Sequence, residues 1–281
     1  MKWSIISDSS SDILTGGLDF GEIHYDTVPF ILRIEDDDFV DDKDVDLEAM
    51  LNKMEHARAA SHSACPSPQA WEEHFLKSDN TIAITISANL SGCYNSAVIA
   101  RDNVLAQHPE KRIHILNSRA TGPETALCIR RLIDLINQNV DFDEVVELAE
   151  QYLADSHTAF ALCSFDNLIK NGRMNKLVGI VAKTLGVWGV GIASDEGTIA
   201  MKGKARGTAK AIDIMLNYMS DCNYRGNRVA IHHCENEKVA QRLKAAIIEL
   251  YPRADVVIRP TRALDSYYAE RGGIIIGFKC N

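Results

Sequence analysis

The fold of this chain is decided by an apolar run that passes through a serine-containing turn into a helical pattern, Thr85-Ile86-Ser87-Ala88-Asn89-Leu90-Ser91-Gly92-Cys93-Tyr94-Asn95-Ser96-Ala97. The β-branched residues over 81–86 predict a buried strand, and the pattern from Ser91 onward predicts a helix over 91–106. The first backbone N–H groups of a helix have no partner within it, and the helix dipole favours negative charge there. The stretch therefore predicts a site for an anionic oxygen, with the Ser91 hydroxyl beside it.

Length and composition indicate a globular protein with about two domains. The chain has 281 residues, of which 46% are hydrophobic and 25% charged, as is usual for such proteins. The net charge of −9 argues against nucleic-acid binding, which needs a basic patch. Most of this charge lies between Glu35 and Asp46, which hold eight acids and one lysine. We interpret this run as a solvated loop. A calcium site is the alternative, but the EF-hand spacing is absent.

The cysteine pattern and the hydropathy pattern indicate where the protein resides. The seven cysteines show no Cys-x-x-Cys spacing, and an odd number in a chain of this length does not indicate a disulfide framework. We find neither a signal-peptide pattern nor an apolar run of membrane-spanning length. We therefore expect a reduced, cytoplasmic protein.

The first half of the chain alternates strand and helix patterns. Strands are predicted over 3–7, 81–86 and 112–117, and helices over 46–59, 91–106, 123–138 and 143–154. Such alternation predicts a parallel sheet covered by helices on both faces. We therefore expect an N-terminal domain of three layers over residues 1–156.

The second half predicts a different sheet. Strands are expected over 158–163, 189–193, 198–203, 228–233, 255–259 and 273–278, a helical hairpin over 165–185, and helices over 208–219 and 236–250. The turn Ser194-Asp195-Glu196-Gly197 predicts a β-hairpin, which makes this sheet mixed. The expected fold class is α/β with two domains, the second over residues 157–281.

Three hydroxyl-rich loops are expected at one end of the sheet in the first half of the chain. They span residues 8–12, 61–68 and 87–91. Ligands of open parallel sheets bind outside the carboxyl ends of the strands, so we expect a shared polar pocket that includes Ser9, Ser10, Ser63 and Ser91. The alternative for each serine is a helix cap or a turn.

Catalytic and nucleotide motifs are weak in this chain. Neither GxGxxG nor GxxxxGK[ST] occurs. A serine hydrolase or acyltransferase that uses Ser91 with His62, His232 or His233 is an alternative function, although Gly-x-Ser-x-Gly is absent. His232 and His233 are adjacent on a strand and would face opposite sides. We therefore favour a packed strand-end histidine over a metal site.

Two basic turns, over 170–173 and 202–207, stand out in an acidic protein. One interpretation is a pair of solvated turns with helix C-cap glycines. The other is a docking surface for an acidic or phosphorylated partner, because the planar guanidinium of arginine suits two-point contacts.

Several of these motifs together resemble the DegV family of bacterial fatty-acid-binding proteins. The family motifs occur here in the same order. Residues 8–12 match its Asp-Ser-Ser-Ser-Asp opening, residues 28–30 its Val-Pro-Leu strand and residues 63–68 its Thr-Ser-Gln-Pro-Ser-Pro loop. Residues 87–97 match its Ser-Ser-x-Leu-Ser-Gly-Thr-Tyr-x-Ser-Ala signature, and residues 171–173 and 205–207 match its Gly-Gly-Arg and Val-Arg-Gly turns. The similarity spans nearly the whole chain.

The resemblance implies a two-domain α/β protein that buries one long-chain fatty acid between its domains. It implies carboxylate contacts from Ser63 and Ser91, with the Gly92 amide nearby. It also implies that the protein is not itself an enzyme, needs no cofactor and presents the carboxylate to a separate ATP-dependent fatty-acid kinase. Arg173 and Arg206 would then face the kinase.

One region departs from the family pattern. The family usually carries Gly-Thr-His-Thr-Gly-Pro-Gly after its penultimate strand, and its histidine helps to hold the ligand head group. Here residues 258–265 contain neither the histidine nor the glycines. We expect that Thr261 or Arg262 substitutes, or that the head group differs. An Arg262 that points into the pocket would favour a third function, the sensing of another anionic small molecule.

Overall fold

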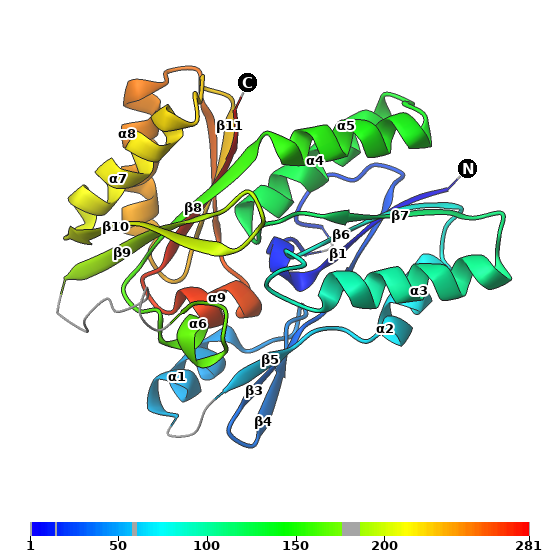
Figure 1. Cartoon of the computed structure of the whole chain (residues 1–281), viewed down its shortest axis with the longest axis horizontal. Coiled ribbons are helices and arrows are strands. Elements are labelled where there is room, and N and C mark those ends of the chain that lie inside the picture. The colour runs from blue at the N-terminus through cyan, green and yellow to red at the C-terminus, as the bar shows by residue number, and fades with distance from the viewer. Residues whose placement is uncertain (1, 15, 58–60, 176–185, 281) are drawn as a thin grey trace.

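The computed structural model describes residues 2–14, 16–57, 61–175 and 186–280. Two large β-sheets stand beside each other, each with its own helices, and a small antiparallel sheet lies below the right-hand one in the view of Figure 1. The N-terminal half builds the parallel sheet and the C-terminal half builds the mixed one. The α/β fold class expected from the sequence is confirmed.

The parallel sheet has the strand order β2-β1-β6-β7. Its strands are β1 (Trp3–Asp8), β2 (His24–Val28), β6 (Asn80–Thr85) and β7 (Arg112–Asn117). Helices α2 (Pro68–Phe75) and α3 (Cys93–Gln107) lie on one side, and α4 (Pro123–Asn137) and α5 (Phe142–Ala154) lie on the other (Figure 1). Along β1, Ile6 packs in the core beneath α3, while Ile5 packs in the core beneath α4 and α5. This alternation is why the strand is apolar throughout.

The mixed sheet has the order β10-β9-β8-β13-β11-β12. Its strands are β8 (Ser156–Leu162), β9 (Val187–Ala193), β10 (Ile199–Arg206), β11 (Arg228–His233), β12 (Asp255–Pro260) and β13 (Ile274–Lys279). Only the β11–β12 pair is parallel among the described strands of this sheet. The predicted hairpin joins β9 to β10. Helices α7 (Thr208–Asp221) and α8 (Glu237–Leu250) cover its outer face.

The remaining elements include two that the sequence did not predict. The small sheet contains β3 (Ile31–Ile34), β4 (Asp37–Val40) and β5 (His62–Ala64), next to α1 (Leu47–His56). A 3-10 helix covers Ser9–Ser11, and α6 covers Asp166–Lys170. The small sheet and α9 (Ala263–Ala269) were not predicted, and neither were β2 and α2 of the first half of the chain. The rest of the helical hairpin expected over 165–185 falls largely on residues 176–185, outside the described residues.

The acidic run does not form the solvated loop expected from its charge. Part of it pairs with β3 as strand β4, and the side chain of Asp41 is fully buried. Asp41 Oδ1 and Oδ2 accept hydrogen bonds of 3.0 Å from the backbone N–H groups of Ala263 and Leu264. The carboxylate thus satisfies amides in the first turn of α9, which have no partner within the helix. This N-terminal contact gives a buried carboxylate a role that composition cannot reveal.

The first turn of α4 fixes how closely the two sheets approach. A Cβ atom added at Gly277 on β13 would lie 2.5 Å from the backbone nitrogen of Glu124. Only glycine lets the helix backbone rest on the strand at this distance. Because α4 also packs on the parallel sheet through Ile129 and Leu132, the helix lies between the sheets.

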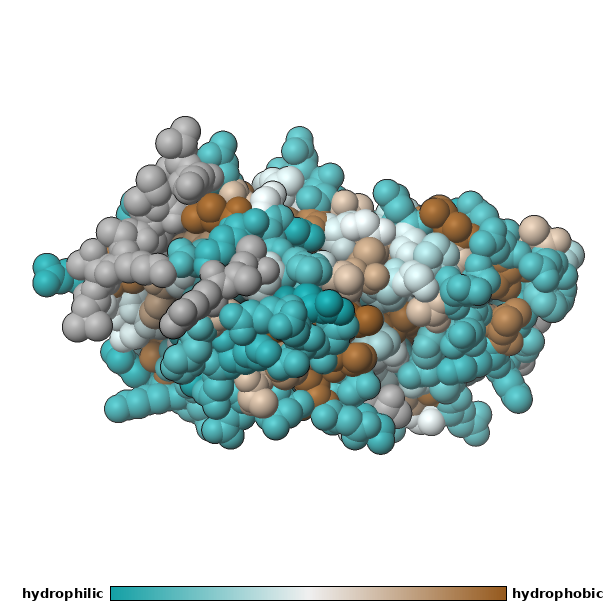
Figure 2. Space-filling model, turned by 90° about the horizontal axis from the view of Figure 1, so that it is seen from below, coloured by the Kyte–Doolittle hydropathy of each residue, from teal (hydrophilic) through white to brown (hydrophobic). Residues whose placement is uncertain are grey.

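The described surface carries no large hydrophobic patch on the face drawn in Figure 2, where hydrophobic residues form small separate groups in a hydrophilic surface. The most exposed large hydrophobic residues come from different elements and include Leu76, Ile99 and Leu250. Within the described part of the chain, no helix is both long and apolar enough to cross a membrane.

Candidate functional site

A cavity lies between the two sheets, beyond the carboxyl ends of β6 and β7. The space at this site, including the open solvent at its mouth, is about 800 Å³. Both halves of the chain line it, and most of its wall is hydrophobic: Phe30, Ile86, Leu90, Ala120, Phe160, Leu162, Leu168, Ala193, Ile199, Leu264, Ala269 and Ile275. The position agrees with the expectation for an open parallel sheet.

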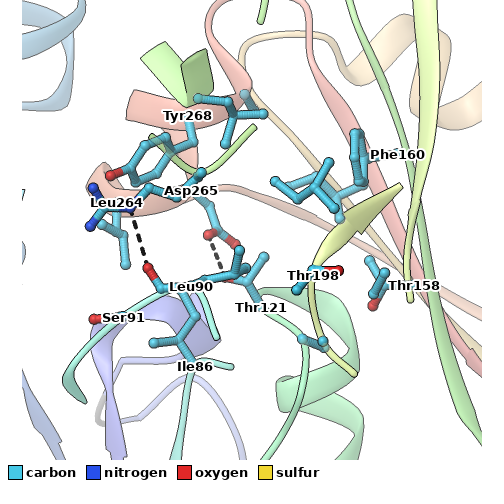
Figure 3. A pocket seen from close by; sticks show the side chains of 18 of the residues that line it. Ile86, Leu90, Ser91, Thr121, Thr158, Phe160, Thr198, Leu264, Asp265 and Tyr268 are labelled. Atoms are coloured by element: carbon cyan, nitrogen blue, oxygen red, sulfur yellow. Dashed lines mark hydrogen bonds between the residues drawn. The ribbon is translucent and has the colours of Figure 1, made fainter. Parts of the chain in front are cut away.

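One side of the cavity carries four polar side chains. Ser63 lies on β5, Ser91 precedes α3, Arg173 follows α6 and Tyr268 lies on α9. The hydroxyl oxygens of Ser63 and Tyr268 are 2.8 Å apart. The Arg173 guanidinium carbon lies 6.0 Å from the centre of the Tyr268 ring. Figure 3 shows Ser91, Leu90 and Tyr268 on this side, with Phe160, Thr158 and Thr198 on the opposite side.

The turn before α3 positions Ser91. The carbonyl of Ser87 accepts hydrogen bonds from the N–H groups of Leu90 and Ser91, at 3.0 and 3.1 Å. Ser91 Oγ accepts a bond of 3.2 Å from the N–H of Cys93, where α3 begins two residues later than expected. The serine therefore caps the helix with an oxygen lone pair, which leaves its hydroxyl proton available to a ligand oxygen.

Arg173 and Arg206, both expected at a partner-facing surface, lie in different places: Arg173 in the cavity wall and Arg206 outside it. Arg173 is part of the cavity wall, where its Nε donates to the Leu90 carbonyl at 3.2 Å and its Nη1 donates to the Asn171 carbonyl at 2.5 Å. These bonds hold a cation beside Ser91. Arg206 lies at the end of β10 with its side chain exposed and is not part of the described cavity wall.

The first hydroxyl-rich loop serves the structure around the cavity rather than the cavity itself. Ser9 Oγ accepts a bond of 3.1 Å from the Phe30 N–H. Ser10 Oγ donates to Asp8 Oδ1, while Asp8 Oδ2 accepts from the Ile86 N–H at 2.8 Å. Both serines are buried, and neither belongs to the described lining. Gly92 is likewise outside that lining, as an exposed residue at the N-cap of α3.

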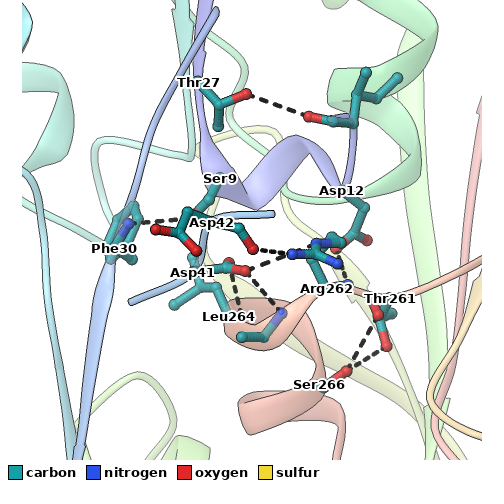
Figure 4. Close-up of polar contacts among 12 residues, drawn as sticks. Ser9, Asp12, Thr27, Phe30, Asp41, Asp42, Thr261, Arg262, Leu264 and Ser266 are labelled. Carbon is teal, nitrogen blue, oxygen red and sulfur yellow. Dashed lines mark hydrogen bonds and ion pairs between the residues drawn. The ribbon is translucent and has the colours of Figure 1, made fainter. Parts of the chain in front are cut away.

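Thr261 and Arg262 do not belong to the described cavity lining, and Figure 4 shows both in polar contacts with other residues. Thr261 Oγ1 is buried and lies 2.6 Å from Ser266 Oγ. The Arg262 side chain donates to the Asp42 carbonyl, and its Nε lies 4.0 Å from Asp41 Oδ1. The acidic end of the β3–β4 hairpin draws the guanidinium toward it. The sensor function that required Arg262 in the pocket therefore lacks its defining contact.

The sequence did not single out six polar residues of the cavity wall. Asp265 and Tyr268 come from α9, and the others are Arg119, Thr121, Thr158 and Thr198. Leu264, Asp265 and Tyr268 line the cavity, and the spacing of Leu264 and Tyr268 places both on one helix face. Thr121, from the loop after β7, donates a hydrogen bond of 2.6 Å to Asp265 Oδ1. The four-residue spacing of Leu264 and Tyr268 could have indicated a helix face toward the cavity, but the sequence did not predict this short helix.

Behind Asp265 lies a buried cluster of titratable side chains. The Nδ1 of His232 is 2.7 Å from Asp12 Oδ2, and both side chains are fully buried. Burial raises the pKa of Asp12 to about 8 and lowers the pKa of His232 to about 4. Burial, together with the nearby Asp12 carboxyl, also raises the pKa of Asp265. These directions favour the uncharged forms, so this wall repels an anionic ligand less than ionised carboxylates would.

Gly122 is required where this cluster meets α4. Its φ is +57°, and an added Cβ would lie 2.5 Å from Asp265 Oδ2. Its N–H donates to the Ser10 carbonyl at 2.7 Å. A side chain here would be strained and would push Asp265 away from Thr121.

The described contacts of His232 and His233 lead to other residues than Ser91. His232 contacts Asp12, whereas His233 Nδ1 accepts from the Asn236 N–H at 3.2 Å, so the neighbours face different ways as expected. Within the described ranges, no hydrogen bond joins Ser91 to a histidine.

The tip of the β9–β10 hairpin completes the wall. Ser87 Oγ donates to the Gly197 carbonyl at 2.7 Å, and Asn89 Nδ2 donates to the Glu196 carbonyl at 2.6 Å. The turn between β6 and α3 therefore fastens the second half of the chain to the first, directly over the cavity.

An α/β fold with an apolar cavity between a parallel and a mixed sheet defines the structural class. The DegV family model matches residues 2–278, and the chain belongs to this family. A DegV domain-containing protein of Streptococcus pneumoniae is 38% identical over 279 residues, which cover 99% of each chain. A DegV domain-containing protein of Streptococcus pyogenes is 37% identical over 279 residues, covering 99% of this chain and all of the relative. The resemblance found in the sequence is confirmed.

Solved structures show what similar proteins hold. The Streptococcus pneumoniae Fatty Acid Kinase (Fak) B3 protein, loaded with linoleic acid, is 37% identical and superposes with a TM-score of 0.96 over all of both chains. A DegV family protein of Eubacterium eligens, loaded with heptadecanoic acid, is 33% identical with a TM-score of 0.95, covering 99% of this chain and all of that one.

Glu124, which is bonded to the cavity-lining Thr158, gives the fold a pH-dependent stability. Its carboxyl lies at the start of α4 and is 3% exposed, and Thr158 Oγ1 donates to its Oε2 at 2.6 Å. Burial raises the pKa of Glu124 from 4.5 to about 7. The folded protein therefore keeps Glu124 protonated in a pH range where the unfolded chain ionises it.

We predict that this group lowers the free energy of unfolding as the pH rises from about 4.5 to about 7, with no further loss above that. The fall should be on the order of 3 kcal/mol. Glu124→Gln removes it, so wild-type stability relative to the variant should decline across that window in chemical denaturation. The exposed Glu144→Gln should follow the wild-type profile. Parallel curves for wild type and Glu124→Gln would contradict the assignment.

Proposed function

We propose that this protein binds one long-chain fatty acid in the cavity between its sheets. The observation that carries the proposal is a largely hydrophobic cavity in which Ser63, Ser91, Arg173 and Tyr268 lie together on one side. The other polar lining residues are Arg119, Thr121, Thr158, Thr198 and Asp265. The carboxylate lies at the group of four on one side and the acyl chain extends toward Phe160. The fatty acids held by similar DegV proteins support this assignment.

The energetics fit this division. Each buried CH₂ group contributes about 0.8 kcal/mol, so the acyl chain supplies most of the affinity. A carboxylate loses its hydration on entering such a site and needs hydrogen bonds in return. Ser91 and Tyr268 have hydroxyl donors, and Arg173 supplies a positive charge. Tyr268 takes the place of the head-group histidine that the family usually carries.

We further propose that the protein is not itself an enzyme and presents the carboxylate to a separate fatty-acid kinase. The kinase-related name of the similar Streptococcus pneumoniae protein supports this role. Arg206 is exposed at the end of β10 and offers a guanidinium to an acidic partner. Arg173 would act on the bound carboxylate from the cavity wall.

Protein purified from bacteria should contain a fatty acid in about equimolar amount, because the cavity is hydrophobic and the acyl chain binds it strongly. Native mass spectrometry should show one adduct, and organic extraction followed by gas chromatography should identify the acid. Delipidated protein should take up one equivalent of oleate. An empty protein that also fails to bind added oleate would overturn the proposal.

Ser91→Ala and Tyr268→Phe should each weaken fatty-acid binding about 10- to 100-fold, because each removes a hydrogen bond to a charged carboxylate. Displacement of a fluorescent fatty acid would measure the affinity. Ser220→Ala, an exposed change on α7, is the control and should bind as wild type. Wild-type affinity in folded Ser91→Ala and Tyr268→Phe would place the carboxylate elsewhere.

Arg206→Glu should leave fatty-acid affinity unchanged. With a fatty-acid kinase from the source organism, it should reduce acyl phosphate formation at least about tenfold, because it reverses one charge of a desolvated pair at the interface. Radiolabelled ATP would report the product. Arg253→Glu, on the exposed loop between α8 and β12, makes the same charge change elsewhere and should retain wild-type turnover. Equal turnover in both variants would remove Arg206 from the kinase surface.

A further inference from the structure

A group of soft ligand side chains lies apart from the cavity, at one end of the mixed sheet. His157 is on β8, Cys222 follows α7 and Cys280 follows β13. One potential ligand atom from each residue lies within 4.8 Å of the other two. Among the described residues this is the one such group of three or more Cys, His, Asp or Glu side chains.

The backbone holds the three residues in place. The Cys280 N–H donates to the Asp155 carbonyl at 2.9 Å, and the Cys222 N–H donates to the Tyr218 carbonyl at 3.0 Å. The His157 ring lies 5.7 Å from Phe278 and 6.1 Å from Tyr218, centre to centre. The imidazole is therefore packed between two aromatic rings, with its Nδ1 at 3.4 Å from the Tyr218 hydroxyl.

The site faces away from the cavity. Successive residues on a strand point to opposite faces of the sheet. Thr158 lines the cavity, so the preceding His157 points to the outer face, where Tyr218 and Phe278 belong to the core beneath α7 and α8. Occupation of this site is therefore independent of the fatty acid.

The ligand types select a soft divalent cation. Thiolates and imidazole prefer zinc over magnesium or calcium, which take oxygen ligands. With Zn–S near 2.3 Å and Zn–N near 2.0 Å, tetrahedral ligands lie about 3.3–3.8 Å apart. A small closure from the observed spacing suffices. All three side chains are at least half buried, and both thiols are free.

We propose that His157, Cys222 and Cys280 bind one Zn²⁺ ion, with water in the fourth position. Each thiol releases its proton on binding. The ion would join the start of β8, the end of α7 and the end of β13. It would thereby tie the C-terminal end of the chain to the outer face of the mixed sheet.

The test uses full-length protein, stripped with a chelator under reducing conditions. Wild type should bind one equivalent of Zn²⁺ in competition with a chromophoric chelator. Co²⁺ should give the visible bands of a tetrahedral ion and near-ultraviolet thiolate charge-transfer absorption. Saturating Zn²⁺ should raise the Tm by roughly 5 °C or more.

Matched variants make the outcome decisive. Cys222→Ser and Cys280→Ser should lose the equivalent of zinc, the charge-transfer band and the Tm rise. Cys163→Ser, which changes an exposed thiol outside the group, should keep all three. Cys222 is only half buried, so its variant is expected to fold, which circular dichroism checks. The proposal would be overturned if wild type bound no zinc or if Cys222→Ser and Cys280→Ser retained it. A Cys222–Cys280 disulfide in the protein under mild reductant would also overturn it.

Discussion

The Asp12 carboxyl group is the contact on which the cavity depends, because it joins three segments that are remote in sequence. Its Oδ2 lies 2.7 Å from His232 at the end of β11, and its Oδ1 accepts from the Arg262 N–H at 2.5 Å. Asp12 itself follows β1 in the left-handed region, with φ of 56°. Removing one partner of such a buried hydrogen bond costs about 1–3 kcal/mol. The parallel sheet, the mixed sheet and α9 meet here, and the cavity is the space that they enclose.

The cavity combines a largely apolar wall with two guanidinium groups in its lining, those of Arg119 and Arg173. Burial raises the pKa of Asp12 and Asp265 and lowers the pKa of His232, which favours the neutral form of each group, so the wall behind α9 opposes an anion less than ionised carboxylates would. The guanidinium of Arg173 lies on the polar side of the cavity, near Ser91 and Tyr268, and donates hydrogen bonds to two backbone carbonyls. A ligand that is apolar along its length and negative at one end is therefore oriented as well as held.

Local patterns predicted the strands and long helices, but not the contacts between distant segments. The run over 81–86 became β6 and the turn at 194–197 became the β9–β10 hairpin, because periodicity and turn chemistry act over a few residues. The charge of Asp41 predicted solvent exposure, yet the residue is buried against α9. That contact spans more than 200 residues, and no pattern within a single sequence encodes it.

The candidate site divides in the same way. Ser63 and Ser91 were found because hydroxyl-rich loops were expected at one end of the sheet, and the structure places both at the cavity. Ser9 looked equivalent in sequence but bonds the Phe30 backbone instead. Tyr268 was missed because α9 is seven residues long and short helices give a weak periodic signal. Whether a serine serves a ligand or a turn is decided by packing that the sequence leaves open.

The bonds from Ala263 and Leu264 to Asp41 have a consequence for biosynthesis. The ribosome makes Asp41 more than 220 residues before the amides that it accepts, and contacts of such separation form slowly. Until α9 emerges, the acidic hairpin stays hydrated and ionised, and the cavity lacks Tyr268 and Asp265. The wall of the cavity can therefore be completed only after residues 263–269 have been synthesised, because α9 contributes Leu264, Asp265 and Tyr268 to it.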